Sequence, residues 1–179
     1  MSDFIKTSRN GQILELVLDK PKANAINYEL SIEMGEVFAA FRDDPDLRVA
    51  ILTGAGGKFF SAGWDLNGAA SDEEYFGEYG EGGFGGFAEL KDLLKPVIIA
   101  VNGLAIGAGF EMLLRADFVI AAEHAIFVLP EARIGVAPDI ASVMLPKLLP
   151  RQQAYEILMT GRQFSAQELA RLGLVNEVV

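Results

Sequence analysis

The chain contains no cysteine and only one histidine, His124, among its 179 residues. Without cysteine it cannot form disulfides, a thiolate nucleophile, an iron–sulfur cluster or the usual structural zinc sites. A single imidazole excludes a His-rich metal site, and a Ser-His-Asp triad would have to use His124. That residue lies in AAEHAIF between two apolar segments, where a surface turn is the simpler interpretation. Acid–base chemistry is therefore expected to rest on Asp, Glu, Lys or Tyr.

Positive charge is also scarce, because 15 basic against 25 acidic side chains give a formal net charge of −10. This balance argues against a general basic face for nucleic acid, and an anionic ligand would need a local positive pocket. No run reaches the roughly 18 apolar residues of a membrane span, and MSDFIKTSRNGQ lacks the layout of a secretory signal. We expect one domain over 1–179, cytoplasmic, that binds neither nucleic acid nor membrane.

Hydrophobic patterning predicts strands that alternate with helices. Runs rich in β-formers predict strands at 13–18, 48–53, 96–101, 118–121 and 125–129. Helical spacing and capping signals predict helices at 28–44, 110–116, 151–159 and from 165 to a residue before Gly173. Such alternation favours an α/β fold with buried sheets.

The segment 67–86, NGAASDEEYFGEYGEGGFGG, interrupts this alternation with glycines, acids and aromatics. It is either a surface loop or a lid beside a ligand site, and the two interpretations are compatible.

Two turns of small residues are candidate anion sites. The P-loop motif fails at Lys58, which is followed by Phe, and the dinucleotide fingerprint fails at Met112, where it needs glycine. The turn 107–109 (GAG) nevertheless leads into an apolar helix, whose first N–H groups have no partner within the helix. A second turn, 61–65 (SAGWD), also follows an apolar run. The two are either ordinary tight turns or two sources of N–H groups for an oxyanion.

Glu111 and Glu131 are the candidate acid–base residues. Glu111 lies in the first turn of the predicted helix, where the helix dipole alone would stabilise a carboxylate. Glu131 follows the apolar run AIFVL and Pro130, where a solvated acid at a strand end is the simpler interpretation. Both lie close to the glycine turns, in a chain that has no cysteine and one histidine for acid–base work. Two carboxylates in different environments can divide the roles of proton donor and acceptor.

Longer motifs resemble a known family. The runs KFFSAGWDL (58–66) and KPVIIAVNGLAIGAGFEMLLRADFVIAAEHAIFVLPEARIGVAP (95–138) are similar to the crotonase, or enoyl-CoA hydratase/isomerase, superfamily. Within it, PKANAI and LPEARIGVAPD most resemble the carnitinyl-CoA dehydratase branch. The resemblance covers nearly the whole chain and implies an α/β fold, a crotonase-like spiral of repeated ββα units. It also implies reversible hydration of a 2-enoyl-CoA such as crotonobetainyl-CoA, by a homotrimer or dimer of trimers. No metal or cofactor is implied apart from the coenzyme A of the substrate.

The resemblance also implies roles for individual residues. The backbone N–H groups of Trp64 and Ala108 match the family's oxyanion hole, and Glu111 and Glu131 match its two catalytic glutamates. Hydration needs a base acting on water at Cβ and an acid delivering a proton to Cα. The residues that match the substrate and CoA contacts are Lys22, Ala23, Ala25, Ile26, Ala62, Asp65, Leu66 and Gly107.

Two hypotheses concern the charged groups of crotonobetainyl-CoA, its phosphates and its quaternary ammonium. The phosphates of CoA need cations, and the candidates are Lys20, Lys22 and Lys58. A quaternary ammonium on the acyl group is held well by aromatic faces. The candidate aromatics are Trp64, Tyr75, Tyr79, Phe84 and Phe87.

Departures from the family pattern leave two rivals open. The stretch 138–145 (PDIASVML) lacks the family's glycines and Arg-Leu pair, so we expect altered placement of water and substrate. Ala108 replaces a more frequent glycine but keeps its N–H. The C-terminal helical part that builds the family's trimer is missing from this sequence, so we expect weaker oligomers. The alternatives are an enoyl-CoA isomerase that uses one glutamate, and a non-catalytic acyl-CoA-binding subunit or fragment.

Overall fold

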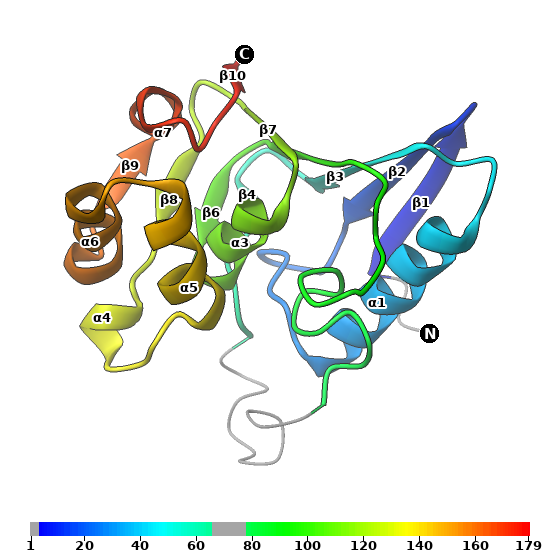
Figure 1. Ribbon diagram of the computed structural model, residues 1–179, viewed down its shortest axis with the longest axis horizontal. Coiled ribbons are helices and arrows are strands. Elements are labelled where there is room, and N and C mark those ends of the chain that lie inside the picture. Colours follow the sequence, from blue (N-terminus) through cyan, green and yellow to red (C-terminus); the bar gives the residue numbers. More distant parts are fainter. Residues whose placement is uncertain (1–3, 66–77) are drawn as a thin grey trace.

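Two sheets organise the computed structural model, which describes residues 4–65 and 78–179 (Figure 1). The six-stranded sheet has the order β1-β2-β3-β5-β7-β10. Its strands are β1 (Ile5–Asn10), β2 (Ile13–Leu18), β3 (Val49–Gly54), β5 (Val97–Val101), β7 (Phe118–Ala121) and β10 (Glu177–Val178). β1 and β2 form an antiparallel hairpin that turns after Asn10, and the other neighbours are parallel.

The second sheet has four strands in the order β4-β6-β8-β9. They are β4 (Phe59–Ser61), β6 (Leu104–Ile106), β8 (Ile126–Val128) and β9 (Gln163–Ser165). The chain alternates between the sheets, because β3, β5 and β7 of the first are followed by β4, β6 and β8 of the second. This repeat confirms the predicted α/β spiral of ββα units.

Helices follow the strand pairs. They are α1 (Tyr28–Asp43), α3 (Ala108–Glu111), the 3-10 helix η1 (Met112–Arg115), α4 (Glu131–Ile134), α5 (Asp139–Leu148), α6 (Arg151–Thr160) and α7 (Ala166–Leu172). The predicted caps are present: Gly161 ends α6 in the left-handed conformation, and Ser165 and Glu168 form the capping box of α7. Within 4–65 and 78–179, no helix is both long and apolar enough to cross a bilayer.

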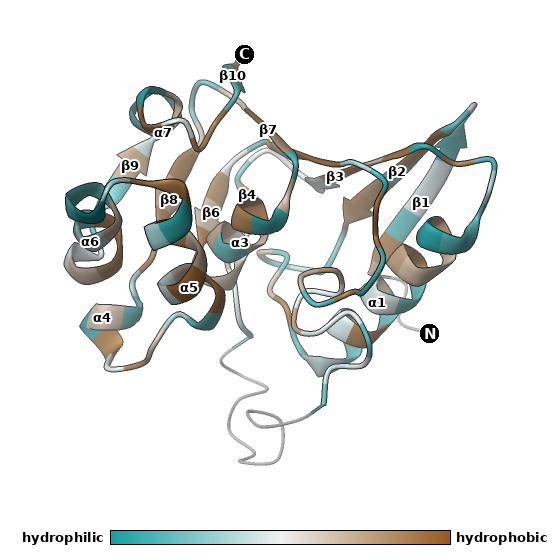
Figure 2. Cartoon of the chain, viewed as in Figure 1, coloured by the Kyte–Doolittle hydropathy of each residue, from teal (hydrophilic) through white to brown (hydrophobic). Residues whose placement is uncertain are grey.

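The hydrophobic core lies where strands and helices meet, and side chains along the strands alternate between buried and partly exposed. Figure 2 shows hydrophobic residues concentrated in β2, β8 and α5, whereas the edge strand β1 is paler. Phe38 and Phe41 of α1 are fully or almost fully buried. Phe110 of α3 and Phe127 of β8 pack with ring centroids 5.9 Å apart, which fixes α3 against the second sheet.

Two predictions about this region were wrong in detail. The helix predicted at 110–116 begins at Ala108 and tightens into η1 after Glu111. Such 3-10 turns are frequent at helix ends. The strand β6 just before the GAG glycines was not predicted, because three residues are too few to show a strand period. His124 lies exposed in the turn between β7 and β8, as predicted, with Nε2 3.2 Å from the Asn102 carbonyl oxygen.

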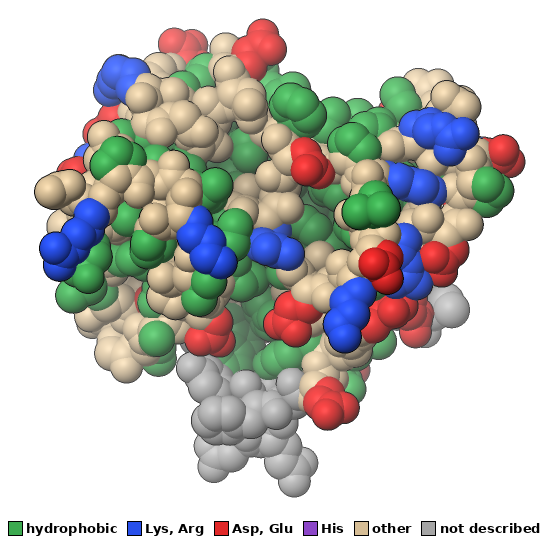
Figure 3. Space-filling view, viewed as in Figure 1, with side chains coloured by type: hydrophobic (Ala, Val, Ile, Leu, Met, Phe, Trp, Pro, Cys, Tyr) green, Lys and Arg blue, Asp and Glu red, His purple; other side chains and the backbone are tan. Residues whose placement is uncertain are grey.

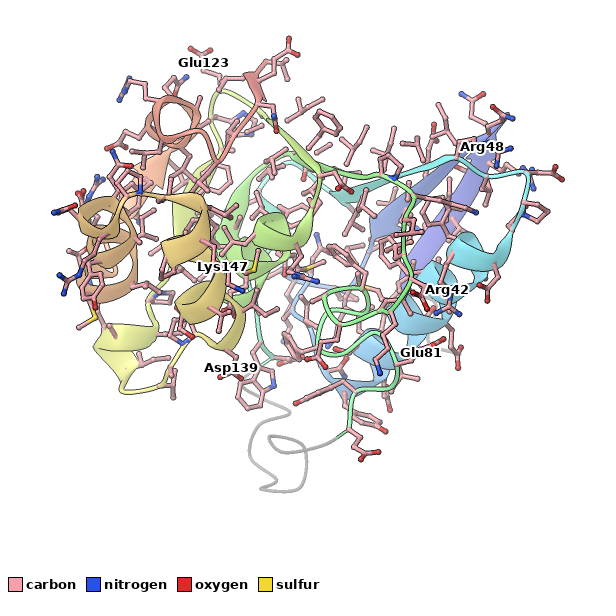
Figure 4. All side chains as sticks on the ribbon, viewed as in Figure 1. Arg42, Arg48, Glu81, Glu123, Asp139 and Lys147 are labelled. Atoms are coloured by element: carbon pink, nitrogen blue, oxygen red, sulfur yellow. The ribbon has the colours of Figure 1, made fainter. Side chains whose placement is uncertain are left out.

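The described part of the predicted lid, from residue 78 to residue 86, packs on α1. A Cβ added to Gly86 would lie 2.3 Å from Met34 Cβ, so only glycine allows this approach. Arg42 of α1 pairs with Glu81 at 3.3 Å, and Figure 4 labels both on the same side of the molecule. Residues 67–77 of the predicted lid lie outside the described residues.

Candidate active site

A pocket of about 240 Å³ lies where α3, α4 and the start of α5 face the loop that carries Tyr79 and Phe84. Its lining is mostly apolar but includes three carboxylates, those of Glu111, Glu131 and Asp139. Among the described residues that line it there is no Lys, Arg or His. Figure 3 shows a hydrophobic centre on the face in view, with both acidic and basic side chains around it.

The two predicted turns meet at this pocket. Gly63 adopts a φ of 79°, and a Cβ there would lie 2.4 Å from the Ile106 carbonyl oxygen and 3.0 Å from the Ala108 nitrogen. Only glycine allows both the backbone conformation and the approach. The peptide that carries the Trp64 N–H therefore lies directly beside the first residue of α3.

The directions of the Trp64 and Ala108 N–H groups follow from the hydrogen bonds that the carbonyls of Gly63 and Gly107 accept. In a trans peptide the C=O and the following N–H point in opposite directions, and the described chain has no cis peptide. The Gly63 carbonyl accepts from the Ile26 N–H at 2.7 Å, so the Trp64 N–H points away from Ile26. The Gly107 carbonyl accepts from the N–H groups of Phe110 and Glu111. The Ala108 N–H therefore points out of the start of α3.

Glu111 is a buried carboxyl with 7% of its surface exposed. Its Oε1 accepts a hydrogen bond from the N–H of Ala141 in α5 at 2.8 Å. Burial raises the pKa of Glu111 to about 7, with a smaller contribution from the charge of Glu131. Hydrogen bonding from Ala141 opposes this rise without cancelling it. Glu111 can therefore exchange a proton near neutral pH.

Glu131, at the start of α4, lies against the Gly107 turn. A Cβ added to Gly107 would lie 2.7 Å from Glu131 Oε1, and Gly107 has a φ of 54° and a ψ of −121° that suit glycine alone. The other carboxyl oxygen, Oε2, is buried and has no hydrogen-bond partner among the described residues. Burial raises the pKa of Glu131. The sequence expectation of a solvated strand-end acid is therefore wrong, and the alternative of a pocket acid fits.

The stretch 138–145, which departs from the family's pattern, contains the N-cap Pro138 and most of α5. Through Ala141 it supplies the N–H that holds Glu111, so the loss of glycines has left a donor in place. Sequence reasoning missed this contact, although Pro138 and Asp139 are typical of a helix start. It also missed Asp139 as a third acid of the pocket.

The predicted CoA loop and the SAGWD turn are bonded to each other. The Ala62 N–H donates to the Ala23 carbonyl at 2.9 Å, and the Asp65 N–H donates to the Ile26 carbonyl at 2.8 Å. Ala25 lies half-buried between those two bonds. Leu66 lies outside the described residues.

The candidate lysines line a second cavity of about 250 Å³. The ammonium of Lys20 pairs with Asp65 at 2.9 Å and its side chain is only 11% exposed, so this positive charge already has a partner. Lys22 and Lys58 also line this cavity, and neither makes an ion pair with another described residue.

Three of the candidate aromatics, Trp64, Tyr79 and Phe84, line the first pocket. The rings of Tyr79 and Phe84 meet edge to face with centroids 5.2 Å apart. The prediction for Phe87 is wrong: it is 4% exposed and packs in the core with its ring 4.8 Å from that of Phe38. Tyr75 lies outside the described residues.

Comparison with known proteins identifies the family. The family model described as "Enoyl-CoA hydratase/isomerase" matches residues 8–179. The chain belongs to the enoyl-CoA hydratase/isomerase family.

Individual relatives agree with this membership. Carnitinyl-CoA dehydratases of Salmonella arizonae and Citrobacter koseri are each 57% identical over the whole chain, which covers 69% of their length. A solved carnitinyl-CoA dehydratase from Mycobacterium avium superposes with a TM-score of 0.91 at 37% identity, over 98% of this chain and 70% of that one. An enoyl-CoA hydratase from Bacillus anthracis gives 0.88 at 33% identity, over 99% and 70%. The enoyl-CoA hydratase/isomerase fold is thus shared over essentially all of this chain.

Proposed function

We propose that the chain is a hydro-lyase that reversibly hydrates a 2-enoyl-CoA thioester, and that its substrate is crotonobetainyl-CoA, which becomes carnitinyl-CoA. The observation that carries the proposal is the meeting of Glu111 and Glu131 with the Trp64 and Ala108 turns at one pocket. The names of the 57% identical relatives support the choice of substrate.

In the proposed mechanism the thioester carbonyl accepts hydrogen bonds from the N–H groups of Trp64 and Ala108. Negative charge that develops on this oxygen as water adds is stabilised by both donors, and each is worth about 100- to 1,000-fold in rate. The partial positive charge at the start of α3 acts in the same direction.

The two glutamates would transfer the protons. Water adding at Cβ needs a base, and the enolate needs an acid at Cα. Burial keeps the pKa of Glu111 at about 7, so both of its protonation states exist at neutral pH. Glu131 brings a buried carboxyl oxygen with no partner among the described residues, which can bond a water or substrate group.

The charges of the two cavities fit the two ends of this substrate. The first pocket has three acids, an aromatic wall and no described cation in its lining, which favours a trimethylammonium group. The second cavity contains Lys22 and Lys58, which suit the phosphates of CoA.

The rival functions fit this arrangement less well. An isomerase that moves one proton needs a single carboxylate, whereas this pocket holds Glu111 and Glu131 together. A non-catalytic subunit has no need for a buried carboxyl whose pKa is raised to about 7, since keeping it ionised costs stability.

We also propose a cytoplasmic assembly of three or six copies built from this crotonase-like domain. Family resemblance supports it, as do large apolar side chains exposed on α4 to α6. These are Ile134, Val143, Leu148, Tyr155 and Met159. Sedimentation equilibrium tests this proposal, and a monomer at all concentrations would contradict it.

The test of the proposed reaction follows the loss of enoyl-thioester absorbance when the purified protein meets crotonobetainyl-CoA. Replacement by glutamine at position 111 or 131 is expected to slow turnover by about 100- to 10,000-fold. Glu123→Gln, at an acid that Figure 4 places at the far end of the molecule from Asp139, is the matched control and should retain the wild-type rate. A folded wild type that binds crotonobetainyl-CoA without turnover would favour the binding subunit instead.

A further inference from the structure

A buried network of hydrogen bonds, made by side chains that do not line the pocket, holds the turn that carries Trp64. The Ser61 hydroxyl donates to the Asn24 carbonyl at 2.8 Å, and the same oxygen accepts from the Gly63 N–H at 3.1 Å. Ser61 has no exposed surface, and Asn24 is 4% exposed. Because both residues are buried, water cannot readily replace either partner. The bonds to the Asn24 carbonyl and from the Gly63 N–H therefore both depend on the Ser61 hydroxyl.

This network constrains the peptide that precedes Trp64. Gly63 is held on both sides, by Ser61 through its N–H and by Ile26 through its carbonyl. Since the Trp64 N–H points opposite to the Gly63 carbonyl, any rotation at Gly63 redirects it. Glycine at a φ of 79° has no side chain to resist such rotation. These two hydrogen bonds, together with the bond from the Asp65 N–H to the Ile26 carbonyl, supply the rigidity that the residue lacks.

Asn24 is a firm anchor for the network. Its Nδ2 group donates to the carbonyls of Ala55, Phe59 and Phe60 at 3.1 to 3.2 Å. Its Oδ1 accepts from the Lys20 N–H at 3.1 Å. These bonds hold Asn24 at a φ of 52°, a conformation that asparagine tolerates better than most residues. The carbonyl that receives the Ser61 hydroxyl is therefore fixed in place.

We infer that Ser61, anchored by Asn24, is a positioning residue that sets the direction of the Trp64 N–H toward the thioester carbonyl. The inference rests on the proposed function, because it concerns the oxyanion hole of that reaction. Position 61 needs a group that donates and accepts at once in a small volume. Serine does so, alanine does neither, and cysteine does both weakly.

Kinetics of Ser61→Ala provide the first test. We expect kcat to fall by about 10- to 100-fold, because a misdirected donor loses part of the 100- to 1,000-fold that a whole donor is worth. KM should change by less than about threefold, since the pocket lining is intact. Ser61→Cys should fall between Ser61→Ala and wild type.

Ser31→Ala is the matched control. Ser31 is equally buried, donates to the Asn27 carbonyl at 3.0 Å and accepts from the Gly85 N–H at 3.2 Å. Ser31→Ala should lower the stability of the protein about as much as Ser61→Ala does. It should not lower kcat to the same extent. Equal losses of kcat in both variants would show that Ser61 acts only through general stability.

A spectroscopic test separates this inference from the proposed function. The probe is 4-trimethylammoniobutanoyl-CoA with a ¹³C carbonyl, a saturated analogue that cannot be hydrated. Binding to wild type and to Ser31→Ala should lower its carbonyl stretching frequency, and binding to Ser61→Ala should lower it much less. A full wild-type shift retained by Ser61→Ala overturns the role of Ser61 alone. An analogue that binds wild type without any shift overturns the oxyanion hole itself. If Ser61→Ala does not fold, Ser61→Cys is judged by the same criteria.

Discussion

The N–H of Ala141 donates a 2.8 Å hydrogen bond to the carboxylate of Glu111, so a residue of α3 is held by the first turn of α5. The bond favours the ionised carboxylate, whereas burial favours the neutral acid. Burial dominates, and the pKa of Glu111 rises to about 7. At neutral pH Glu111 is therefore present in both its protonated and its ionised form, and the stability of the fold depends on pH.

The first prediction is that Glu111→Gln stabilises the protein at alkaline pH. Between its unfolded pKa of 4.5 and its folded pKa of about 7, Glu111 binds more protons in the native state, so wild-type stability falls as pH rises through this window. One pKa unit corresponds to about 1.4 kcal/mol, so ionised Glu111 costs up to roughly 3–4 kcal/mol above pH 7. Glutamine has no charge, and its carbonyl can still accept from Ala141.

Urea unfolding at several pH values checks this prediction. The stability gain of Glu111→Gln over wild type should be small near pH 4.5 and should grow until about pH 7 to 8. The exposed Glu123→Gln variant controls for the loss of one negative charge from an acidic protein. A gain independent of pH would contradict the raised pKa.

Much of the fold could be predicted from the sequence because local signals coincide with it. The strands 13–18 and 118–121 have the predicted bounds, and α1 ends before Pro45, where the preceding residue disfavours the helix. Strands of two or three residues, such as β6 and β10, were not predicted because they are too short to show a period. The edge strand β1, with six residues, was not predicted either, because its sequence IKTSRN is mostly polar.

The site was harder to predict, because its charges depend on distant partners. Glu111 and Glu131 were found through the glycine turns beside them. The Ala141 donor lies 30 positions from Glu111, and no local pattern links the two. The same holds for Lys20, whose partner Asp65 is 45 positions away. Sequence reasoning names the chemical groups, and the tertiary contacts decide which of them are already paired.

The second prediction concerns Gly107→Ala. The new methyl group would meet Glu131 Oε1 at 2.7 Å, and a φ of 54° with a ψ of −121° adds backbone strain of roughly 1–3 kcal/mol. Gly11→Ala is the control, since Gly11 has a φ of 59° but nothing within 4 Å of a Cβ. Both variants should lose stability, but only Gly107→Ala should lose hydration activity, by at least about tenfold if Glu131 is catalytic. Equal activity in the two variants would separate Glu131 from the reaction.

The third prediction concerns the second cavity. Lys22→Glu and Lys58→Glu should each raise the dissociation constant for CoA by about five- to tenfold, because a charge pair near the surface is worth about 1 kcal/mol. The effect should shrink at high salt, where screening is strong. Arg171→Glu, an exposed change in α7, makes the same alteration of net charge and should leave CoA binding unchanged. Calorimetric titration with CoA at two salt concentrations distinguishes a local phosphate contact from a general effect of charge.

The last prediction concerns the aromatic wall and substrate choice. A quaternary ammonium gains about 0.5–2 kcal/mol from an aromatic face, and leucine at the same place offers apolar volume without that attraction. Phe84→Leu should therefore lower the preference for crotonobetainyl-CoA over crotonyl-CoA by about 2- to 30-fold, measured as the ratio of their kcat/KM values. The Tyr79 ring, edge-on to Phe84, should orient less well without it.

Phe87→Leu provides the control for this loss of aromatic surface. Phe87 is a phenylalanine of the same loop, but it packs on Phe38 in the core and does not line the pocket. Its replacement should lower stability and leave the preference between the two substrates unchanged. A wild type that turns over both substrates equally would show that Trp64, Tyr79 and Phe84 form only an apolar wall. The carboxylates of the pocket would then also fail to select a cation, and the site would not distinguish crotonobetainyl-CoA from a neutral enoyl-CoA.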